Sequence, residues 1–254
     1  MVINIQDKQS QHKGMSAWDD ILVIDDQLSS EEKILKSSVR SYCQEKLLPR
    51  IIDDNRNENF SREIFNEMGE LGILGSYLHG YGCAGTNYVS YGLIAREIEN
   101  IDSAYRSIMS VQTSLVMFPI YQFGTEAQKE EYLPRLAKGE IIGSFGLTEP
   151  DAGSDPGAMK TKAIKVKGGY ELTGTKTWIS NAPYADVIIV WAKDEDNVIR
   201  GFIVDSPKDY QPPKLKVNYL YALQQRGKLL WKMFFVRKIK FYQKRQVWAD
   251  LFNA

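Results

Sequence analysis

FGLTEPDAGSDP at residues 145–156 and TKTWISNA at residues 175–182 are the stretches that decide the fold of this chain. The first begins like a strand and becomes a loop of Pro, Gly, Asp and Ser, which are turn-forming residues. Such small residues let a ligand approach the backbone closely, and the hydroxyls of Thr148 and Ser154 can hydrogen-bond it. The second stretch offers an aromatic wall and donors, which a planar heteroaromatic cofactor needs. Composition alone favours a surface turn and an ordinary strand Trp, so both interpretations stay open at this point.

Around these stretches, apolar and polar residues alternate as they do in strands. The strand-like segments are IIGSFGL (141–147), MKTKAIKV (159–166), YELTGTKTWI (170–179), ADVIIVWA (185–192) and IRGFIVD (199–205). They are short and rich in β-branched residues, and turn residues such as the Gly168-Gly169 pair separate them. This pattern predicts antiparallel strands and a β domain that begins near residue 141.

The sequence before residue 141 has helical spacing instead. Ser29 with Glu32, and Thr125 with Gln128, form two capping boxes, each of which starts a helix. We expect the first of these helices to end near Leu48, because Pro49 follows it. The mostly apolar segment 103–123 predicts a long buried helix. The chain is therefore predicted to be an α+β protein in which an all-α helical domain precedes an antiparallel β domain.

Composition narrows the class of protein and its compartment. The chain has 254 residues and no apolar run long enough to span a bilayer. Residues 1–17 lack the features of a signal or transit peptide, so we expect a disordered arm and a cytoplasmic protein. Cys43 and Cys83 have no metal or redox spacing, and only two His are present. We therefore expect no metal site and no His-based catalytic triad.

One motif points to a dinucleotide and is rejected on its context. GYGCAG at residues 80–85 matches G-x-G-x-x-G and precedes a helix. The preceding residues, LGILGSYLHG, make a poor strand because three glycines interrupt them, and the next helix is followed by another helix rather than by a strand. We therefore interpret residues 80–85 as a loop between helices.

The two opening stretches, together with Tyr105-Arg106-Ser107, resemble the acyl-CoA dehydrogenase family and, within it, the glutaryl-CoA dehydrogenases. The resemblance runs from about Trp18 to about Lys216. It implies an N-terminal helical domain at 18–140, a middle β domain at 141–216 and an FAD cofactor. It also implies oxidative decarboxylation of glutaryl-CoA to crotonyl-CoA, with electrons passed to an electron-transfer flavoprotein. In the family, a carboxylate removes a proton beside the thioester carbonyl while a hydride passes to the flavin.

The resemblance also assigns site residues. It implies that the flavin is bound by Phe145, Gly146, Leu147, Thr148, Glu149, Pro150, Asp151, Ala152, Gly153 and Ser154, and by Trp178, Ile179 and Ser180. Ser154 would also contact the acyl-CoA, and Arg106 with Ser107 would bind the distal carboxylate of a glutaryl group. An Arg in the apolar run SAYRSIMSVQTSLVMF is costly to bury unpaired, and its fork suits a carboxylate. Arg106 therefore favours glutaryl-CoA over a monocarboxylic acyl-CoA, and argues against an acyl-CoA oxidase of the same fold.

The resemblance stops near Lys216. The family continues with further strands and a C-terminal helical-bundle domain, which carries the catalytic glutamate, part of the flavin site and the homotetramer interface. Residues 217–254 instead hold eight Lys or Arg against one Asp, whereas residues 1–216 hold 24 Lys or Arg against 31 Asp or Glu. We expect these residues to be an out-of-frame tail, without helix or strand pattern. A sequence typical of the family can be written in codons that, when they are read in the next reading frame, encode residues 216–234. The alternative, a basic element for membrane or nucleic acid, is the weaker interpretation.

These expectations leave two functions open. The first is an FAD-dependent acyl-CoA dehydrogenase whose truncated chain lacks a catalytic residue and has little or no turnover. Glu149 belongs to the loop pattern itself, so we do not expect it to replace the missing base. The second is a non-catalytic remnant that at most binds flavin or acyl-CoA weakly.

Overall fold

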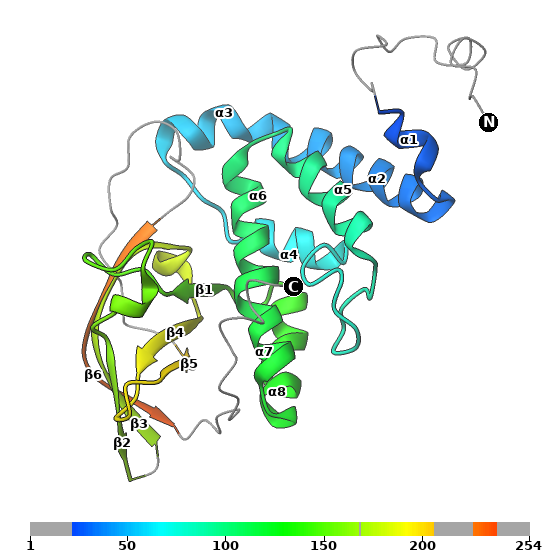
Figure 1. Cartoon of the computed structure of the whole chain (residues 1–254). Helices are drawn as coiled ribbons and strands as arrows, with labels where there is room; N and C mark the ends of the chain where they lie inside the picture. The colour runs from blue at the N-terminus through cyan, green and yellow to red at the C-terminus, as the bar shows by residue number, and fades with distance from the viewer. Residues whose placement is uncertain (1–21, 168, 206–225, 238–254) are drawn as a thin grey trace, which may run out of the picture.

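A computed structural model describes residues 22–167, 169–205 and 226–237 of the chain. A group of helices lies on one side and a curled sheet on the other (Figure 1). The helices are α1 (Ile24–Gln27), α2 (Ser30–Tyr42), α3 (Leu48–Asn57), α4 (Glu63–Glu70), α5 (Tyr88–Glu99), α6 (Ser103–Ser110), α7 (Phe118–Phe123) and α8 (Glu126–Ala137). The strands are β1 (Gly143–Gly146), β2 (Lys162–Val166), β3 (Gly169–Ser180), β4 (Val187–Lys193), β5 (Ile199–Asp205) and β6 (Arg226–Arg237). The predicted order of a helical half before a β half is confirmed.

Both predicted capping boxes are present. At α2 the Ser29 hydroxyl accepts from the Glu32 amide, and the Glu32 carboxylate accepts from the Ser29 amide. Thr125 and Gln128 make the same reciprocal pair at α8. Two of the amides that a helix start leaves without a partner are satisfied in each case.

The prediction that Pro49 ends the first helix is wrong. The π-helical segment Cys43–Leu47 joins α2 to α3, and Pro49 lies in the first turn of α3. In this wider turn the Leu48 amide donates to the Cys43 carbonyl, five residues back. A proline in a helix interior lacks a donor and crowds the carbonyl four residues before it, and in this chain the wider π-helical turn lies directly before the turn that contains Pro49. The helix continues through the proline.

The predicted helix 103–123 shows the same arrangement. The π-helical segment Val111–Met117 joins α6 to α7, and Pro119 follows it by two residues.

Between α4 and α5, the glycine motif at 80–85 lies in a loop, as predicted. No helix within the described residues combines the length and the apolar character that crossing a bilayer requires.

The predicted β domain is present and most of its strand pairs are antiparallel, but the sheet also contains parallel pairing and is therefore mixed. Its strand order is β1-β4-β2-β3-β6, with β5 paired to β4. β1 runs parallel to β4, and Gly143 pairs with Val187. The β2–β3 hairpin separates these two strands in the sequence, so the chain has room to return and lie parallel to β1. The β2–β3, β3–β6 and β4–β5 pairs are antiparallel.

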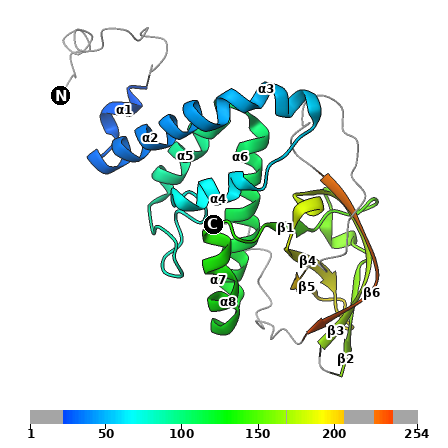
Figure 2. The ribbon, with the colours of Figure 1, turned by 180° about the vertical axis from the view of Figure 1, so that it is seen from behind.

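Strand β6 corrects a second expectation. Residues 226–237 were expected to have no strand pattern, yet their backbone pairs antiparallel with β3 from Gly169 to Ser180. β6 lies at the edge of the sheet away from the helices, as the front and rear views both show (Figures 1 and 2). Edge pairing needs only backbone donors and acceptors, which every non-proline residue carries. The rest of the expected out-of-frame tail lies outside the described residues, as does the expected N-terminal arm.

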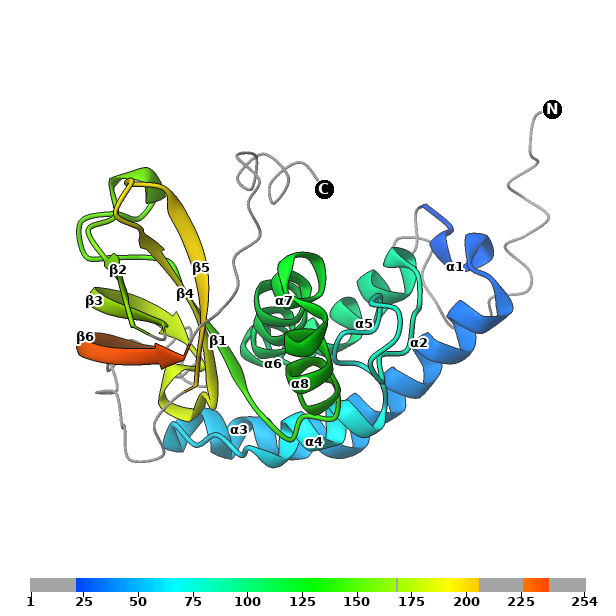
Figure 3. The same cartoon turned by 90° about the horizontal axis from the view of Figure 1, so that it is seen from below.

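The alternation along β4 separates two hydrophobic cores. Val187, Ile189 and Trp191 join the core that the helices share, whereas Ile188 and Val190 face a second core. That second core is closed by residues of β2, β3 and β5, because the sheet curls over itself (Figure 3). Successive side chains of a strand point to opposite faces of the sheet. Strand β4 therefore contributes one set of side chains to the core shared with the helices and the other set to the core inside the sheet.

Candidate functional site

The two stretches that decided the sequence interpretation lie side by side. The Thr177 amide of β3 donates to the Thr148 carbonyl at 2.9 Å. The Lys176 ammonium donates to the Leu147 carbonyl, also at 2.9 Å. The loop that follows β1 is therefore bound directly to the C-terminal part of β3, and their side chains can act on one ligand.

Trp178 has an unusual backbone conformation. Its φ is 60°, in the left-handed region, and its side chain is 52% exposed although it belongs to a strand. The β3–β6 register shifts between Lys176 and Ile179, so Trp178 lies at an irregularity that turns a large aromatic ring outward. A bulky residue at positive φ costs on the order of 1–3 kcal/mol, and such strain is concentrated at functional sites.

The residues next to Trp178 face in different directions. Ile179 is buried in the second core and is 2% exposed, so only its backbone can meet a ligand. Ser180 is half-buried. In the loop after β1, Thr148 is half-buried, whereas Gly153 and Ser154 are exposed. The exposed groups here are thus the Trp178 ring, Gly153 and the Ser154 hydroxyl, whereas the hydroxyls of Thr148 and Ser180 are half-buried.

Lys176 is a structural residue that the sequence interpretation did not identify. Its ammonium lies 2.8 Å from the Glu149 carboxylate, and the two side chains are 0% and 5% exposed. The Lys160 amide at 2.6 Å, the Thr161 amide at 3.0 Å and the Thr161 hydroxyl also donate to Glu149. The signal in the sequence was a Lys at an inward-facing position of a predicted strand, two residues after Gly174. A buried cation requires a buried partner of opposite charge, so this Lys indicated a buried carboxylate nearby.

The Glu149 carboxylate holds the loop through donors from Lys160, Thr161 and Lys176. Burial would raise the pKa of Glu149, but the Lys160 amide, the Lys176 ammonium and Thr161 together hold that pKa below its usual value. A carboxylate with a low pKa and several donors accepts a proton poorly. The expectation that Glu149 does not replace the family base stays a prediction.

The remaining residues of the stretch 145–154 are partly buried and partly exposed. Pro150 and Asp151 are exposed, and Asp151 forms an ion pair of 2.8 Å with Lys160. Ala152 is buried and closes a bridge with Glu149 through two backbone hydrogen bonds. Phe145 of β1 is half-buried and packs edge-on against Trp191, with ring centroids 5.9 Å apart. The first part of the loop is thus fixed in the protein, and its second part faces solvent.

The Arg106 side chain differs from the sequence expectation. Arg106 was expected to be a buried cation that needs a substrate carboxylate, but its Nε lies 2.5 Å from Oε2 of Glu99 at the end of α5, and its side chain is 37% exposed. The Ser103 hydroxyl and then the Arg106 guanidinium lower the pKa of Glu99. Ser107, next to Arg106 on α6, is half-buried. Arg106 is therefore held in place by an acidic neighbour seven residues earlier.

The described residues hold no group of His, Cys, Asp and Glu that could bind a metal. They do hold an outward-facing Trp on a strained strand, a neighbouring loop of small and hydroxyl residues, and an oriented Arg on a helix. With the helical half and the curled mixed sheet, these features define a two-domain α+β protein with a surface suited to a planar aromatic cofactor.

Comparison with known families identifies this class. Residues 29–140 match the family described as "Acyl-CoA dehydrogenase, N-terminal domain", and residues 144–220 match "Acyl-CoA dehydrogenase, middle domain". The chain belongs to the acyl-CoA dehydrogenase family.

Individual relatives agree with this assignment. The chain is 37% identical over 189 residues to a probable acyl-CoA dehydrogenase, YngJ, of Bacillus subtilis, which covers 71% of this chain and 50% of the relative. It is 39% identical over 181 residues to mitochondrial isovaleryl-CoA dehydrogenase of Pongo abelii, covering 69% of this chain and 43% of the relative. A crystal structure of a glutaryl-CoA dehydrogenase from Mycobacterium smegmatis in complex with FADH2 superposes with a TM-score of 0.84 at 38% identity, covering 92% of this chain and 61% of that one. The chain thus spans about half the length of these curated relatives.

Proposed function

We propose that this chain binds FAD and an acyl-CoA, as part of an FAD-dependent acyl-CoA dehydrogenase. The observation that carries the proposal is the place of Trp178, a strained and exposed aromatic residue on a strand that is bonded to the loop of Thr148. The solved relative with FADH2 supports this choice of cofactor. In this proposal the domains divide at residues 140 and 141, between α8 and β1.

In the proposed mechanism the residues of this chain bind and orient. Trp178 covers one side of the flavin ring, and Thr148 and Ser180 hydrogen-bond its edge. Ser154 reaches the acyl-CoA from the exposed part of the loop. The chemistry that FAD supplies when bound is acceptance of a hydride from the acyl chain. The buried Glu149–Lys176 pair keeps the loop in one position, so that these groups meet the ligand without rearranging.

Glutaryl-CoA is the proposed acyl substrate. The Nε of Arg106 is occupied by Glu99, and a guanidinium has four further N–H donors on its two Nη atoms. Glu99 thus holds the fork while the Nη edge can take the distal carboxylate of the substrate, with Ser107 beside it. The relatives include a glutaryl-CoA and an isovaleryl-CoA dehydrogenase, so Arg106 rather than the overall likeness supports this choice. Oxidative decarboxylation to crotonyl-CoA, electron transfer to an electron-transfer flavoprotein and a tetrameric assembly are proposed from the resemblance.

The second candidate is ligand binding without turnover. Glu149 is engaged by four donors and is unsuited to remove a proton. We propose no other carboxylate of the described residues as the base. In this case the chain keeps the cofactor and acyl surfaces and does not carry out the reaction.

One experiment separates the two candidates. The visible absorbance of the purified chain is recorded with FAD, and again after anaerobic addition of glutaryl-CoA. Bleaching of the flavin by glutaryl-CoA would support the dehydrogenase, and bound flavin that never bleaches would support binding alone. Isovaleryl-CoA is the control for the distal carboxylate, and Arg106→Gln is expected to remove the difference between the two thioesters. A chain that binds no FAD would overturn both candidates.

A further inference from the structure

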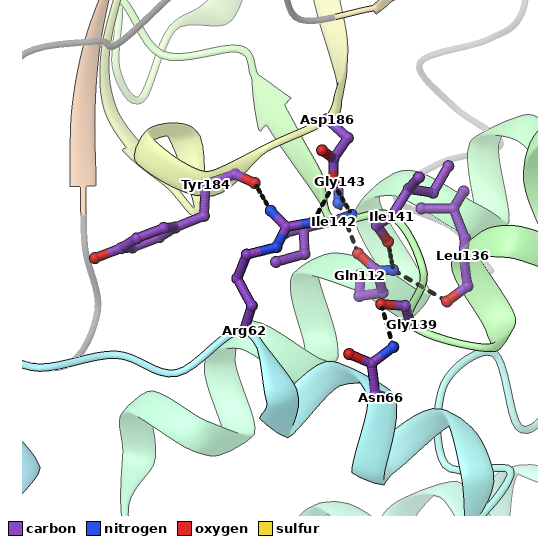
Figure 4. Close-up of polar contacts among 10 residues, drawn as sticks. All are labelled: Arg62, Asn66, Gln112, Leu136, Gly139, Ile141, Ile142, Gly143, Tyr184 and Asp186. Atoms are coloured by element: carbon purple, nitrogen blue, oxygen red, sulfur yellow. Dashed lines mark hydrogen bonds and ion pairs between the residues drawn. The ribbon is translucent and has the colours of Figure 1, made fainter. Parts of the chain in front are cut away.

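Gln112 joins three backbone groups at the junction of the two domains. It lies in the π-helical segment between α6 and α7 and is 0% exposed. Its side-chain nitrogen donates to the carbonyls of Leu136 at 3.1 Å and Ile141 at 2.9 Å, and its oxygen accepts from the Gly143 amide at 2.8 Å (Figure 4). Both N–H donors and the carbonyl oxygen of this amide are therefore used. The end of α8, the connecting segment and the first residue of β1 are held by one side chain.

Gly143 is held from its other side as well. The Asn181 side chain donates to the Gly143 carbonyl at 3.1 Å, and Asn181 directly follows Trp178, Ile179 and Ser180. Asn181 is 4% exposed and has a φ of 65°, a conformation that Asn adopts more readily than most residues. A Cβ on Gly143 would lie 2.5 Å from Cγ1 of Val116, so only glycine fits between these elements. Both backbone groups of Gly143 are thus bonded to buried side-chain amides.

We propose that Gln112 and Asn181 are positioning residues that hold the start of β1 and the flavin-facing end of β3 at a set place relative to α6. This inference rests on the proposed function, because that function assigns the loop after β1 and the end of β3 to the cofactor. The helix that carries Arg106 continues into the segment that carries Gln112, so the acyl-facing residue and the side chain that bonds the start of β1 lie on one continuous helical element. Gly143 leads by two residues to Phe145, and Asn181 ends the stretch that contains Trp178.

Other contacts hold the domains together without touching Gly143. The Arg62 guanidinium donates to the Asp186 carboxylate and to the Tyr184 carbonyl, both at 2.6 Å (Figure 4). The Tyr132 hydroxyl of α8 donates to the Asp205 carboxylate at 3.1 Å, at the end of β5. The Tyr132 contact provides a matched control, because its loss weakens the junction and leaves both bonds of Gly143 intact.

The test compares Asn181→Gly, Gln112→Met and the control Tyr132→Phe in the full chain. Glycine accepts the backbone of Asn181 and removes only its amide, and Met has the length of Gln without its donors and acceptor. FAD affinity, the shape of the flavin absorption band and amide hydrogen exchange in residues 143–148 and 176–181 are measured. Asn181→Gly is the decisive variant, since Gln112→Met removes three buried hydrogen bonds to the backbone, those of the Leu136 and Ile141 carbonyls and of the Gly143 amide, and can fail to fold.

We expect Asn181→Gly to weaken FAD binding by about tenfold, to change the flavin band and to speed exchange in both segments together. Tyr132→Phe is expected to leave all three readouts within about twofold of the parent chain, even if it lowers the thermal midpoint as much as Asn181→Gly does. Equal effects of the two variants, or an unchanged FAD affinity in Asn181→Gly, would overturn the inference. If the parent chain binds no FAD, the proposed function fails, and the exchange data alone decide whether the two amides couple β1 to β3.

Discussion

The buried ion pair of Glu149 and Lys176 yields the strongest prediction on stability. Lys176→Met keeps the volume of the side chain and removes its charge, which leaves a carboxylate that is 5% exposed without its counter-ion. Removing one partner of a buried pair costs about 3–5 kcal/mol. Three donors remain on Glu149, from Lys160 and Thr161, so we expect the lower end of that range, about 3 kcal/mol.

Urea and thermal unfolding of the full chain measure this effect. A loss of about 3 kcal/mol corresponds to a fall of about 6–12 °C in thermal midpoint. The double variant Glu149→Gln/Lys176→Met is expected to be more stable than Lys176→Met, because no charge is left buried. The control is Lys160→Met, which removes an ammonium that pairs with Asp151 in the same loop but is exposed, and we expect no measurable change in its midpoint. Equal midpoints for Lys176→Met and Lys160→Met would refute the argument.

Three further predictions concern pH, strain and specificity. The pKa of Glu149 is lower in the folded than in the unfolded chain, so its contribution to stability is present above the unfolded pKa and is lost as the pH falls through the folded pKa. The free energy of unfolding should therefore fall less steeply with decreasing pH in Glu149→Gln than in the parent chain, and an identical slope would contradict this. Trp178→Gly should relieve the positive φ and raise the free energy of unfolding by about 1 kcal/mol while weakening FAD binding, and stronger binding would refute the proposed role. Arg106→Gln should weaken binding of glutaryl-CoA by about tenfold and leave butyryl-CoA unaffected, as measured by titration calorimetry, and a parallel loss for both would exclude carboxylate recognition.

Most local features of the fold were predictable from the sequence. The capping boxes of Ser29 and Thr125 and the strands near β1 to β5 depend on residues a few positions apart. The adjacency of the loop after β1 and the end of β3 was expected from the resemblance, and the structure joins them through Thr148 and Thr177. The roles of individual residues toward FAD and the acyl group remain proposals.

The errors have a common physical cause. Pro49 was expected to stop a helix, but a π-helical turn precedes it and the helix continues, which the presence of a proline alone does not report. The parallel pairing of β1 with β4 depends on a return of the chain over about 40 residues, which alternation does not report. Arg106 was judged within its own helix, whereas its partner Glu99 comes from α5.

The sequence by itself determined the class of elements, their order and the family, because capping, alternation, turn chemistry and motif spacing are short-range properties. Only the tertiary structure decided which polar side chains share a site. It joined Lys176 to Glu149, and it placed the amides of Gln112 and Asn181 on the two sides of Gly143, across 31 and 38 residues of chain. The physical reason is that a buried polar group must find a partner wherever packing brings one, and sequence distance does not limit that choice.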